Sequence, residues 1–442
     1  MSNKFMPHTE EDIRVMLEKV GAKSIDDLYA DVPSEVIFRE EYDLPEAMSE
    51  IELRRHFEEL GKKNERLTIF AGGGAYDHYS PSTVAHLLAR SEFYTAYTPY
   101  QPEISQGTLQ YIFEYQSMIS ELTGMEATNA SMYDGATAAA EVMFMMVASA
   151  KKRNRVVLSE TLPQRVIDVV KTYAKFHGVD LTVVAAKYGV SDLETIAAEL
   201  AKGDVAGVIV PEPNRYGIIE DFTGFADTVH AAKAALAIFG DPSALAVLRS
   251  PAEWGADIAC GDGQSLGMPL SFGGPYLGYI SCSKSMLRKM PGRVVGATKD
   301  ADGKRAYVLT LQAREQHIRR EKATSNICSN QSLMALYATI YLALMGKQGM
   351  KEVNRLSCDG AHYLKSRLLE TGKFTEAFPG KPFLKEFTLR TELDVKALNK
   401  RLLAHGIMGG LDLGGGLVSF AVTEQRTREE IDNLVTLIEK EA

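Results

Sequence analysis

A carboxylate at the end of an apolar run is the first feature of this 442-residue sequence that points to chemistry. Asp241 closes the run Ala-Ile-Phe-Gly-Asp and is followed by Pro242. In open sheets of parallel strands, ligands bind beyond the carboxyl ends of the strands, where this side chain would lie. A carboxylate there can pair with a protonated ring nitrogen of a cofactor, or it can simply cap the helix that follows.

A loop that leads into a helix is the second feature. Gly135, Ala136 and Thr137 follow Ser-Met-Tyr-Asp, and small residues at such a helix start let backbone N–H groups approach an anion such as a phosphate. An ordinary helix cap uses the same residue types, so this motif alone is weak.

The segment 255–280 reads as a strand, a polar loop and a glycine-rich strand. Enzymes that use pyridoxal phosphate place their Schiff-base lysine in such a layout, shortly after the strand. Here Gln264 stands in that place, 23 residues after Asp241, and no lysine lies between Lys233 and Lys284. Because an amide nitrogen is not nucleophilic, the sequence predicts a cofactor-type pocket that lacks its covalent anchor.

The elements that position these residues follow a strand–helix rhythm. Short apolar runs begin at Arg155, Leu181, Gly207 and Ala237, and alanine-rich stretches separate them. This alternation predicts an α/β fold with a mostly parallel sheet and crossover helices. We expect the crossover helices at 164–176, 192–202 and 225–235, and further strands at 257–260 and 276–281.

Three regions follow from these patterns. Residues 1–110 form an N-terminal segment of helices and irregular loops, with helices expected after Thr9 and over 49–60. Residues 111–345 form the large α/β domain, which ends with a helix over 331–344. Residues 346–442 form a smaller α+β domain. Its expected elements are strands at 383–389 and 417–422 and helices at 394–405 and 427–441.

The composition excludes several classes of protein. Apolar residues make up 45% of the chain, and the net charge of −9 argues against a nucleic-acid binder. The longest apolar stretch, residues 136–150, contains Glu141 and is shorter than the roughly 20 residues that span a bilayer. We therefore expect a cytoplasmic protein without a membrane partner. Four scattered cysteines and nine histidines form no ligand motif, so we expect no metal.

Three long stretches carry a specific resemblance. They are Tyr-Thr-Pro-Tyr-Gln-Pro-Glu-Ile-Ser-Gln-Gly-Thr-Leu-Gln at 97–110, the glycine-rich segment at 255–278, and Arg-Glu-Lys-Ala-Thr-Ser-Asn-Ile-Cys-Ser-Asn-Gln at 320–331. Over nearly its whole length the chain resembles the alpha subunits of the two-subunit P-protein family of the glycine cleavage system, the glycine dehydrogenases (decarboxylating).

The resemblance implies the aspartate-aminotransferase fold, fold type I of the pyridoxal phosphate enzymes. It implies an α2β2 assembly in which the beta subunit, subunit 2, carries the lysine and the cofactor. With that partner the family decarboxylates glycine and passes the aminomethyl group to the lipoyl arm of the H protein. The T and L proteins complete the same system. The alpha subunit is expected to keep the fold, to hold no cofactor covalently, and to be active only with its partner.

Site residues are expected in two places. A degenerate pocket would contain Gly135, Thr137, Asp241 and Gln264. Other residues would act across the subunit interface, as hydrogen-bond donors to the cofactor phosphate or as walls of a lipoyl channel. The proposed donors are Thr324, Ser325 and Asn326, and the proposed channel residues are Tyr97, Tyr100, Gln101, Tyr76 and His78.

A purely structural role stays open as an alternative for each of these sites. The serine and threonine run is also typical of a plain helix cap, the tyrosine-rich loop can pack internally, and a satisfied surface histidine is common. Two alternative functions also remain. One is an independent pyridoxal phosphate enzyme that uses another lysine, such as Lys284, and the other is a non-catalytic scaffold or regulatory paralogue.

Overall fold

The structure of the protein is a computed structural model that describes residue 5, residues 7–323 and residues 325–441. Contacts within the chain divide it into two units, Met1–Glu65 and Arg66–Ala442. The predicted boundaries at residues 110 and 345 stay predictions.

The first unit consists of short helices joined by extended chain. Its two α-helices are α1 (Glu10–Val20) and α2 (Glu50–Gly61). Each begins with a reciprocal cap, in which a hydroxyl and a carboxylate three residues later satisfy each other's backbone N–H groups. Thr9 and Ser49 are the capping residues, so the predicted start of each helix is confirmed. None of the described residues of this unit is buried.

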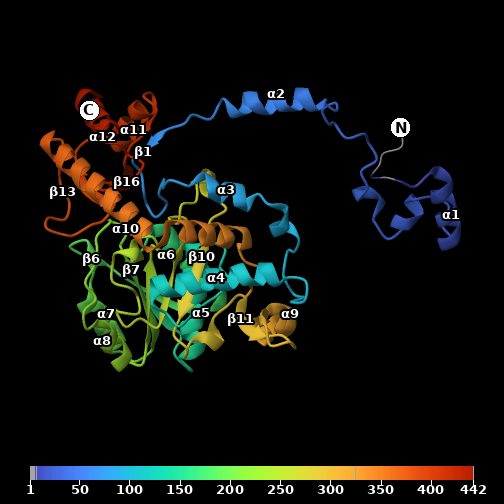
Figure 1. The fold of residues 1–442 in the computed structure, drawn as a ribbon, viewed down its shortest axis with the longest axis horizontal. Helices are drawn as coiled ribbons and strands as arrows, with labels where there is room; N and C mark the ends of the chain where they lie inside the picture. The colour runs from blue at the N-terminus through green and yellow to red at the C-terminus, as the bar shows by residue number, and fades with distance from the viewer. Residues whose placement is uncertain (1–4, 6, 324, 442) are drawn as a thin grey trace. The chain divides into compact units, whose positions relative to one another are not determined.

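A seven-stranded sheet forms the centre of the second unit (Figure 1). Five neighbouring strands are parallel, and β10 runs antiparallel to both of its neighbours. The strands, in spatial order, are β2 (Ala127–Thr128), β10 (Gly278–Cys282), β9 (Ile258–Asp262), β8 (Ala235–Gly240), β7 (Val205–Glu212), β3 (Arg155–Ser159) and β4 (Asp180–Val184). The strand–helix rhythm and the mostly parallel α/β sheet are therefore confirmed.

Both faces of this sheet are buried, as parallel sheets require. Along β8 the side chains alternate between two apolar clusters: Leu236 and Ile238 join one, and Ala237 and Phe239 join the other. The second cluster contains the methionines of α5 (Gly135–Ser149). The remaining crossover helices are α6 (Gln164–His177), α7 (Leu193–Leu200) and α8 (Phe225–Ala231).

Two long helices pack beside the sheet, and the second of them leads to the C-terminal region. They are α4 (Gln106–Thr123) and α10 (Ser332–Glu370), which contact each other. The helix predicted over 331–344 is too short, because the chain bends at Gly346 and continues helically to Glu370. Gly346 has φ 56° and ψ −176°, a backbone conformation that favours glycine.

The C-terminal region is a four-stranded antiparallel sheet packed against helices. Its apolar cluster centres on Phe387, Leu389 and Phe420. The strands, in spatial order, are β13 (Phe374–Glu376), β14 (Glu386–Thr391), β17 (Leu417–Ala421) and β16 (Leu411–Gly414). The helices are α11 (Val395–Leu403) and α12 (Arg428–Glu441). The predicted α+β character of this region is confirmed.

Several strand pairings were not predicted from the sequence, and two of them bear on the architecture. A hairpin of β11 (Val294–Lys299) and β12 (Arg305–Thr310) follows β10. The short strand β1 (Thr68–Ile69) pairs in parallel with β15 (Ile407–Met408). This second pairing brings the glycine-rich loop that follows β1 next to the C-terminal sheet.

Candidate functional site

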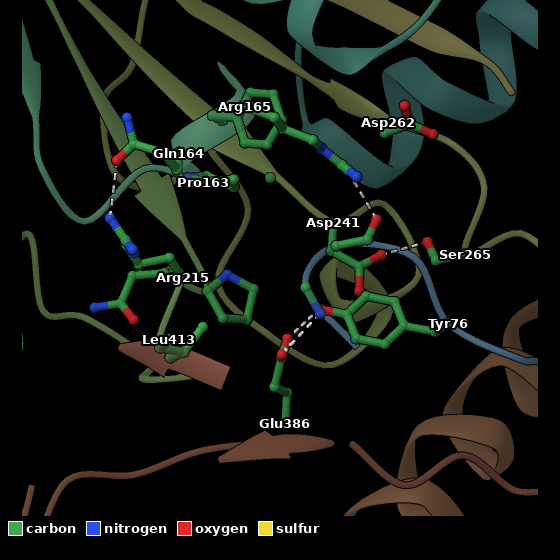
Figure 2. Close-up of a pocket in the computed structure, with 16 residues that line it drawn as sticks. Tyr76, Pro163, Gln164, Arg165, Arg215, Asp241, Asp262, Ser265, Glu386 and Leu413 are labelled. Carbon is green, nitrogen blue, oxygen red and sulfur yellow. Dashed lines mark hydrogen bonds between the residues drawn. The ribbon is translucent and has the colours of Figure 1, made fainter. Parts of the chain in front are cut away.

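A cavity of about 230 Å³ lies at the carboxyl ends of the parallel strands (Figure 2). Ligands of open α/β sheets bind in this position. Its walls come from the chain that follows β7, β8 and β9, from the glycine-rich loop 71–80 and from the C-terminal sheet. The lining residues with the most chemical potential are Tyr76, Arg165, Asp241, Asp262, Ser265 and Glu386.

Gln264 is fully buried, and both the nitrogen and the oxygen of its side-chain amide form hydrogen bonds within the chain. Its Nε2 donates to the backbone oxygens of Tyr76 and Met268, at 2.8 and 2.7 Å. Its Oε1 accepts the Tyr76 N–H at 2.8 Å. This reciprocal pair fastens the glycine-rich loop over the cavity. Gln264 therefore clamps the loop at the place where the sequence predicts a missing anchor.

The Asp241 carboxylate, at the end of β8, already has a cation. The Lys385 Nζ lies 2.7 Å from Oδ2, while Oδ1 accepts the Ser243 N–H at 3.0 Å and a short hydrogen bond from the Ser265 hydroxyl. Burial alone would raise the pKa of Asp241, but the Lys385 ammonium and the hydrogen bonds from Lys385 and Ser265 hold that pKa below its usual value. Asp241 is thus ionised and neutralised by a side chain of its own chain.

The helix start at Gly135 and Thr137 is also satisfied internally. The Gly135 N–H donates to Asp262 Oδ2 at 2.9 Å, and the Thr137 N–H donates to Asp134 Oδ1 at 2.8 Å. A Cβ atom at residue 135 would lie 2.8 Å from the Asp262 backbone nitrogen, so only glycine fits this approach. The two carboxylates therefore occupy the positions where the sequence predicts a phosphate.

Tyr76 closes the cavity from the side of the C-terminal sheet. Its hydroxyl donates to Glu386 Oε2 at 2.8 Å, and its ring centre lies 4.2 Å from Lys385 Nζ. Glu386 Oε1 accepts the Gly73 N–H at 2.8 Å. A Cβ atom on the neighbouring Gly72 would lie 2.8 Å from the same oxygen, which is too close. The glycines of the loop are therefore required for its close approach to β14. Burial raises the pKa of both Glu386 and Tyr76.

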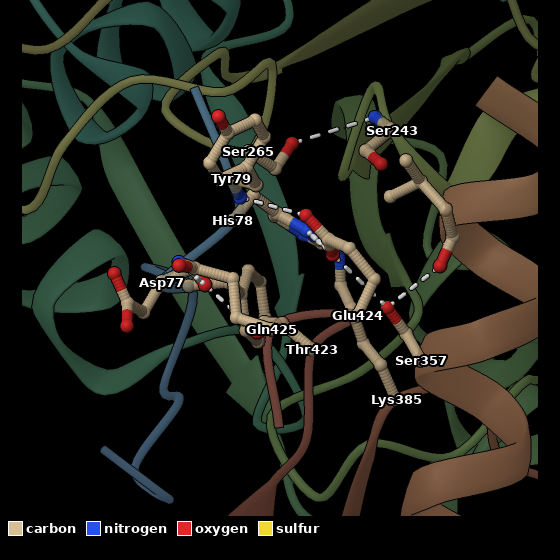
Figure 3. A network of polar contacts seen from close by, with 12 residues as sticks. Asp77, His78, Tyr79, Ser243, Ser265, Ser357, Lys385, Thr423, Glu424 and Gln425 are labelled. Atoms are coloured by element: carbon tan, nitrogen blue, oxygen red, sulfur yellow. Dashed lines mark hydrogen bonds and ion pairs between the residues drawn. The ribbon is translucent and has the colours of Figure 1, made fainter. Parts of the chain in front are cut away.

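His78 is buried between the carboxylate of Glu424 and the ammonium group of Lys385 (Figure 3). Its Nδ1 lies 2.7 Å from Glu424 Oε2, and its Nε2 lies 3.0 Å from Lys385 Nζ. Burial and the Lys385 ammonium lower the pKa of His78, so the neutral ring donates from Nδ1 to Glu424 and accepts at Nε2. The alternative of a satisfied surface histidine is wrong, because only 3% of His78 is exposed.

Comparisons with known proteins decide the family. The sequence profile of the glycine cleavage system P-protein matches residues 3–438. A probable glycine dehydrogenase (decarboxylating) subunit 1 from Moorella thermoacetica is 52% identical over 437 residues, which are 98% of this chain and 98% of that protein. This chain belongs to the P-protein family.

Solved structures agree with that assignment. A crystal structure of a glycine decarboxylase (P-protein) of the glycine cleavage system, in inhibitor-bound form, is 41% identical with a TM-score of 0.92, and covers all of both chains. An alanine–glyoxylate aminotransferase from Nostoc sp. has a TM-score of 0.59 at 19% identity, and covers 85% of this chain and 95% of that chain. The predicted pyridoxal phosphate fold type I is confirmed.

The pocket of this P-protein family member does not fit pyridoxal phosphate, although its fold is that of enzymes which use this cofactor. A lysine would be needed at Gln264, but the amide there is fully buried and engaged. A protonated ring nitrogen would need Asp241, which is paired with Lys385. A phosphate would need the Gly135 N–H, which Asp262 accepts. These three groups therefore have internal partners already.

The tyrosine-rich loop lies on the surface of the second unit. Tyr97 is 83% exposed and Tyr100 is 51% exposed, and Gln101 is exposed as well. The Tyr100 hydroxyl accepts a hydrogen bond of 3.4 Å from the buried Arg293, and the Tyr100 ring lies 5.7 Å from the ring of His317. The alternative of internal packing therefore does not hold for Tyr97, and it holds only in part for Tyr100.

The proposed phosphate donors lie partly outside the described residues. Thr324 is not among them. Ser325 accepts the Ile327 N–H at 3.0 Å, which is a local turn, and its hydroxyl partly offsets the burial that raises the pKa of Glu141 to about 7. Asn326 is exposed. Arg293 connects this segment to Tyr100, because its guanidinium also donates to the Cys328 carbonyl at 2.7 Å.

Sequence reasoning missed the residues that fill the pocket. Lys385 and Glu386 precede or open β14, and Asp262 ends β9. Lys385 and Glu386 stand in no motif, and Lys385 lies 144 residues after its partner Asp241. The one available signal was Asp262 in the glycine-rich segment. A carboxyl group is a suitable acceptor for the N–H groups at a helix start, such as that of α5.

Two further observations concern the described residues only. None of their helices combines the length and the apolar content that a membrane span needs. No three of their histidine, cysteine, aspartate and glutamate side chains are grouped as metal ligands.

Proposed function

We propose that this chain is the subunit of a two-chain glycine decarboxylase that does not carry the cofactor. The observation that supports this most is the buried amide of Gln264, which clamps Tyr76 instead of offering an amine. A second chain, subunit 2, supplies the lysine and binds pyridoxal phosphate covalently. The name "subunit 1" of the relative from Moorella thermoacetica supports the existence of that second chain.

The proposed reaction is the decarboxylation of glycine, followed by transfer of the aminomethyl group to the lipoyl arm of the H protein. The likeness to a crystallised glycine decarboxylase of the glycine cleavage system, with a TM-score of 0.92, supports this activity. We further propose an α2β2 assembly in the cytoplasm that works together with the T and L proteins. Pyridoxal phosphate, held by subunit 2, would supply the electron sink for the carbanion left by carbon dioxide.

The contribution of this chain would be a wall beside the partner's active site. A lipoyl arm is an apolar tether with a disulfide-bearing end, so its path needs aromatic and apolar sides. The exposed rings of Tyr97 and Tyr100, together with His317, offer such a surface. Tyr76 and His78 are buried inside this chain, so the proposed channel rests on Tyr97, Tyr100 and Gln101 instead.

We propose Ser325 and Asn326, with Thr324, as donors toward the phosphate in the partner's site. The Ser325 hydroxyl accepts the Ile327 N–H and is bonded to Glu141 within the chain, so donation to the partner's phosphate requires it to exchange Glu141 for that phosphate. Both side chains lie in an irregular segment between α9 (Gln316–Arg319) and α10, which leaves them outside any helix.

The test is reconstitution of glycine–bicarbonate exchange with lipoylated H protein. Each chain is purified separately and assayed alone and in combination, and borohydride reduction then shows which chain holds the cofactor. We expect exchange only with both chains and a covalent label only on subunit 2.

Two results would contradict the proposal. A covalent label on this chain would support an independent pyridoxal phosphate enzyme, for instance through Lys284, although that residue is exposed and does not line the cavity. Full exchange activity of subunit 2 alone would support a scaffold or regulatory role.

A further inference from the structure

The first unit exposes an unusual amount of apolar surface. We call residues 7–65 the N-terminal arm. None of its residues is buried, and 16 of its large apolar side chains are at least one-third exposed. Tyr42 is 74% exposed and Phe57 is 61% exposed. Scattered exposed apolar side chains are normal on a protein surface, but such a concentration is typical of a surface that packs against another one.

The helices of the arm are patterned for burial on one side. In α1, Ile13, Met16, Leu17 and Val20 recur at the spacing of a single helix face. In α2, Leu53, Phe57 and Leu60 form the equivalent stripe. Helices of 11 and 12 residues are marginal in water on their own, even with good caps, because nucleation is costly. The two helices therefore need a partner surface against which their apolar faces can pack.

The charge of the first unit, to which the arm belongs, indicates what kind of surface the arm contacts. Residues 1–65 contain nine Lys and Arg and 17 Asp and Glu, which gives a net charge of −8. Residues 66–442 contain 40 and 41, which gives −1. Nearly all the net charge of the chain is thus in this segment. A second copy of the arm would repel it, and a nucleic acid or an anionic membrane would repel it as well.

We infer that the arm docks on subunit 2, in an apolar groove that is rimmed by basic side chains. This inference rests on the proposed function, because that function supplies the second chain. A specific interface uses about 20–30 residues from each partner, and the arm alone offers that many. Acidic side chains around apolar anchors give such an interface its partner choice and its association rate.

The test compares two matched variants of the full chain. Leu53→Gln with Phe57→Gln removes two anchors from the stripe of α2 while keeping good helix formers. Arg55→Gln with Glu59→Gln changes two other positions of the same helix and leaves the net charge unchanged. The dissociation constant for the lysine-bearing subunit 2 is measured for each by calorimetry, at low and at high sodium chloride.

We expect the anchor variant to raise the dissociation constant at least about tenfold, since apolar anchors carry most interface energy. The control variant should stay within about twofold. The dissociation constant of the unchanged chain should rise with salt, because the proposed contact is partly ionic. Hydrogen exchange should show the amides of α1 and α2 protected only after subunit 2 is added.

Three results would overturn the inference. The first is that the anchor variant binds subunit 2 as tightly as the unchanged chain does. The second is that the amides of the arm are protected from exchange in the isolated chain. The third is self-association of the chain that the anchor variant abolishes. Failure of the proposed function looks different, because both unchanged chains together would then show no glycine–bicarbonate exchange. An active pair whose arm variants bind normally would overturn the arm inference alone.

Discussion

Replacing Gln264 by lysine restores the amine that the fold expects, and it should nevertheless fail to restore cofactor binding. In the structure the Gln264 amide exchanges two hydrogen bonds with the Tyr76 backbone and donates a third to Met268. A lysine amine can donate to the two carbonyl oxygens, but it cannot accept the Tyr76 N–H. Leaving that buried N–H unpaired costs about 1–3 kcal/mol, and burying the amine adds to the cost.

Binding should fail because two further contacts are blocked. Asp241 is neutralised by Lys385 at 2.7 Å, and the Gly135 N–H is bonded to Asp262 at 2.9 Å. A cofactor would have to displace both partners. Each displacement separates a buried and satisfied pair, which is unfavourable by several kcal/mol when one charge is left unpaired. We therefore expect Gln264→Lys to lower the free energy of unfolding by about 3 kcal/mol and to remain colourless with pyridoxal phosphate.

The assay is urea unfolding together with absorbance and borohydride fixation of the cofactor. Gln264→Met is the matched control, since it loses the same three hydrogen bonds without adding an amine. It should be destabilised at least as much as the lysine variant and should also bind nothing. A yellow lysine variant that fixes one cofactor per chain, beside a colourless methionine variant, would refute the view of an internally filled pocket.

Three other perturbations test separate parts of the structure. Lys385→Met should lower the free energy of unfolding, measured in urea, by about 3–5 kcal/mol, because it leaves Asp241 buried without its cation. The double variant that also carries Asp241→Asn should recover part of this loss. Burial raises the pKa of Glu212 to about 8, above the unfolded value of about 4.3, so the folded state loses stability as pH rises between these values. Glu212→Gln should therefore be more stable than the unchanged chain at pH 8 by about 1–3 kcal/mol, and not at pH 4, in denaturant titrations at both values. Tyr97→Ala should change the free energy of unfolding by no more than about 0.5 kcal/mol, since the ring is 83% exposed. It should nevertheless slow glycine–bicarbonate exchange about tenfold when subunit 2 and H protein are present. An unchanged exchange rate would show that Tyr97 does not line the channel.

The α/β core was predictable because its signals are local and periodic. Short apolar runs begin within two residues of β3, β4, β7 and β8, and parallel sheets buried on both faces require such runs. The helix starts at Thr9, Ser49 and Thr427 were predictable for the same reason, since a capping box spans only four residues. The extent of α10 was not, because a glycine that ends one helix and a glycine that bends a longer one look alike in sequence.

The contents of the pocket were predictable only in outline. Asp241 and Gln264 stand in recognisable positions relative to strands, so their placement followed from the fold. Their partners did not, since Tyr76 and Lys385 arrive from loops far away in the chain. Nothing in the local sequence around either residue distinguishes it from a surface residue. The buried position of His78 was missed for this reason as well.

The internal partners also explain how a fold built around a cofactor can stay stable without one. An empty pocket would leave a buried carboxylate without a cation and the N–H groups at the helix start without an anion, and each such defect costs stability. Lys385 supplies the cation, the Asp262 carboxyl group accepts the Gly135 N–H, and the Gln264 amide replaces a covalent link with a clamp on the loop. Folding of this chain should therefore be independent of pyridoxal phosphate. Because its pocket is already satisfied, the surfaces that we propose for a partner, the tyrosine-rich loop and the N-terminal arm, lie outside that pocket.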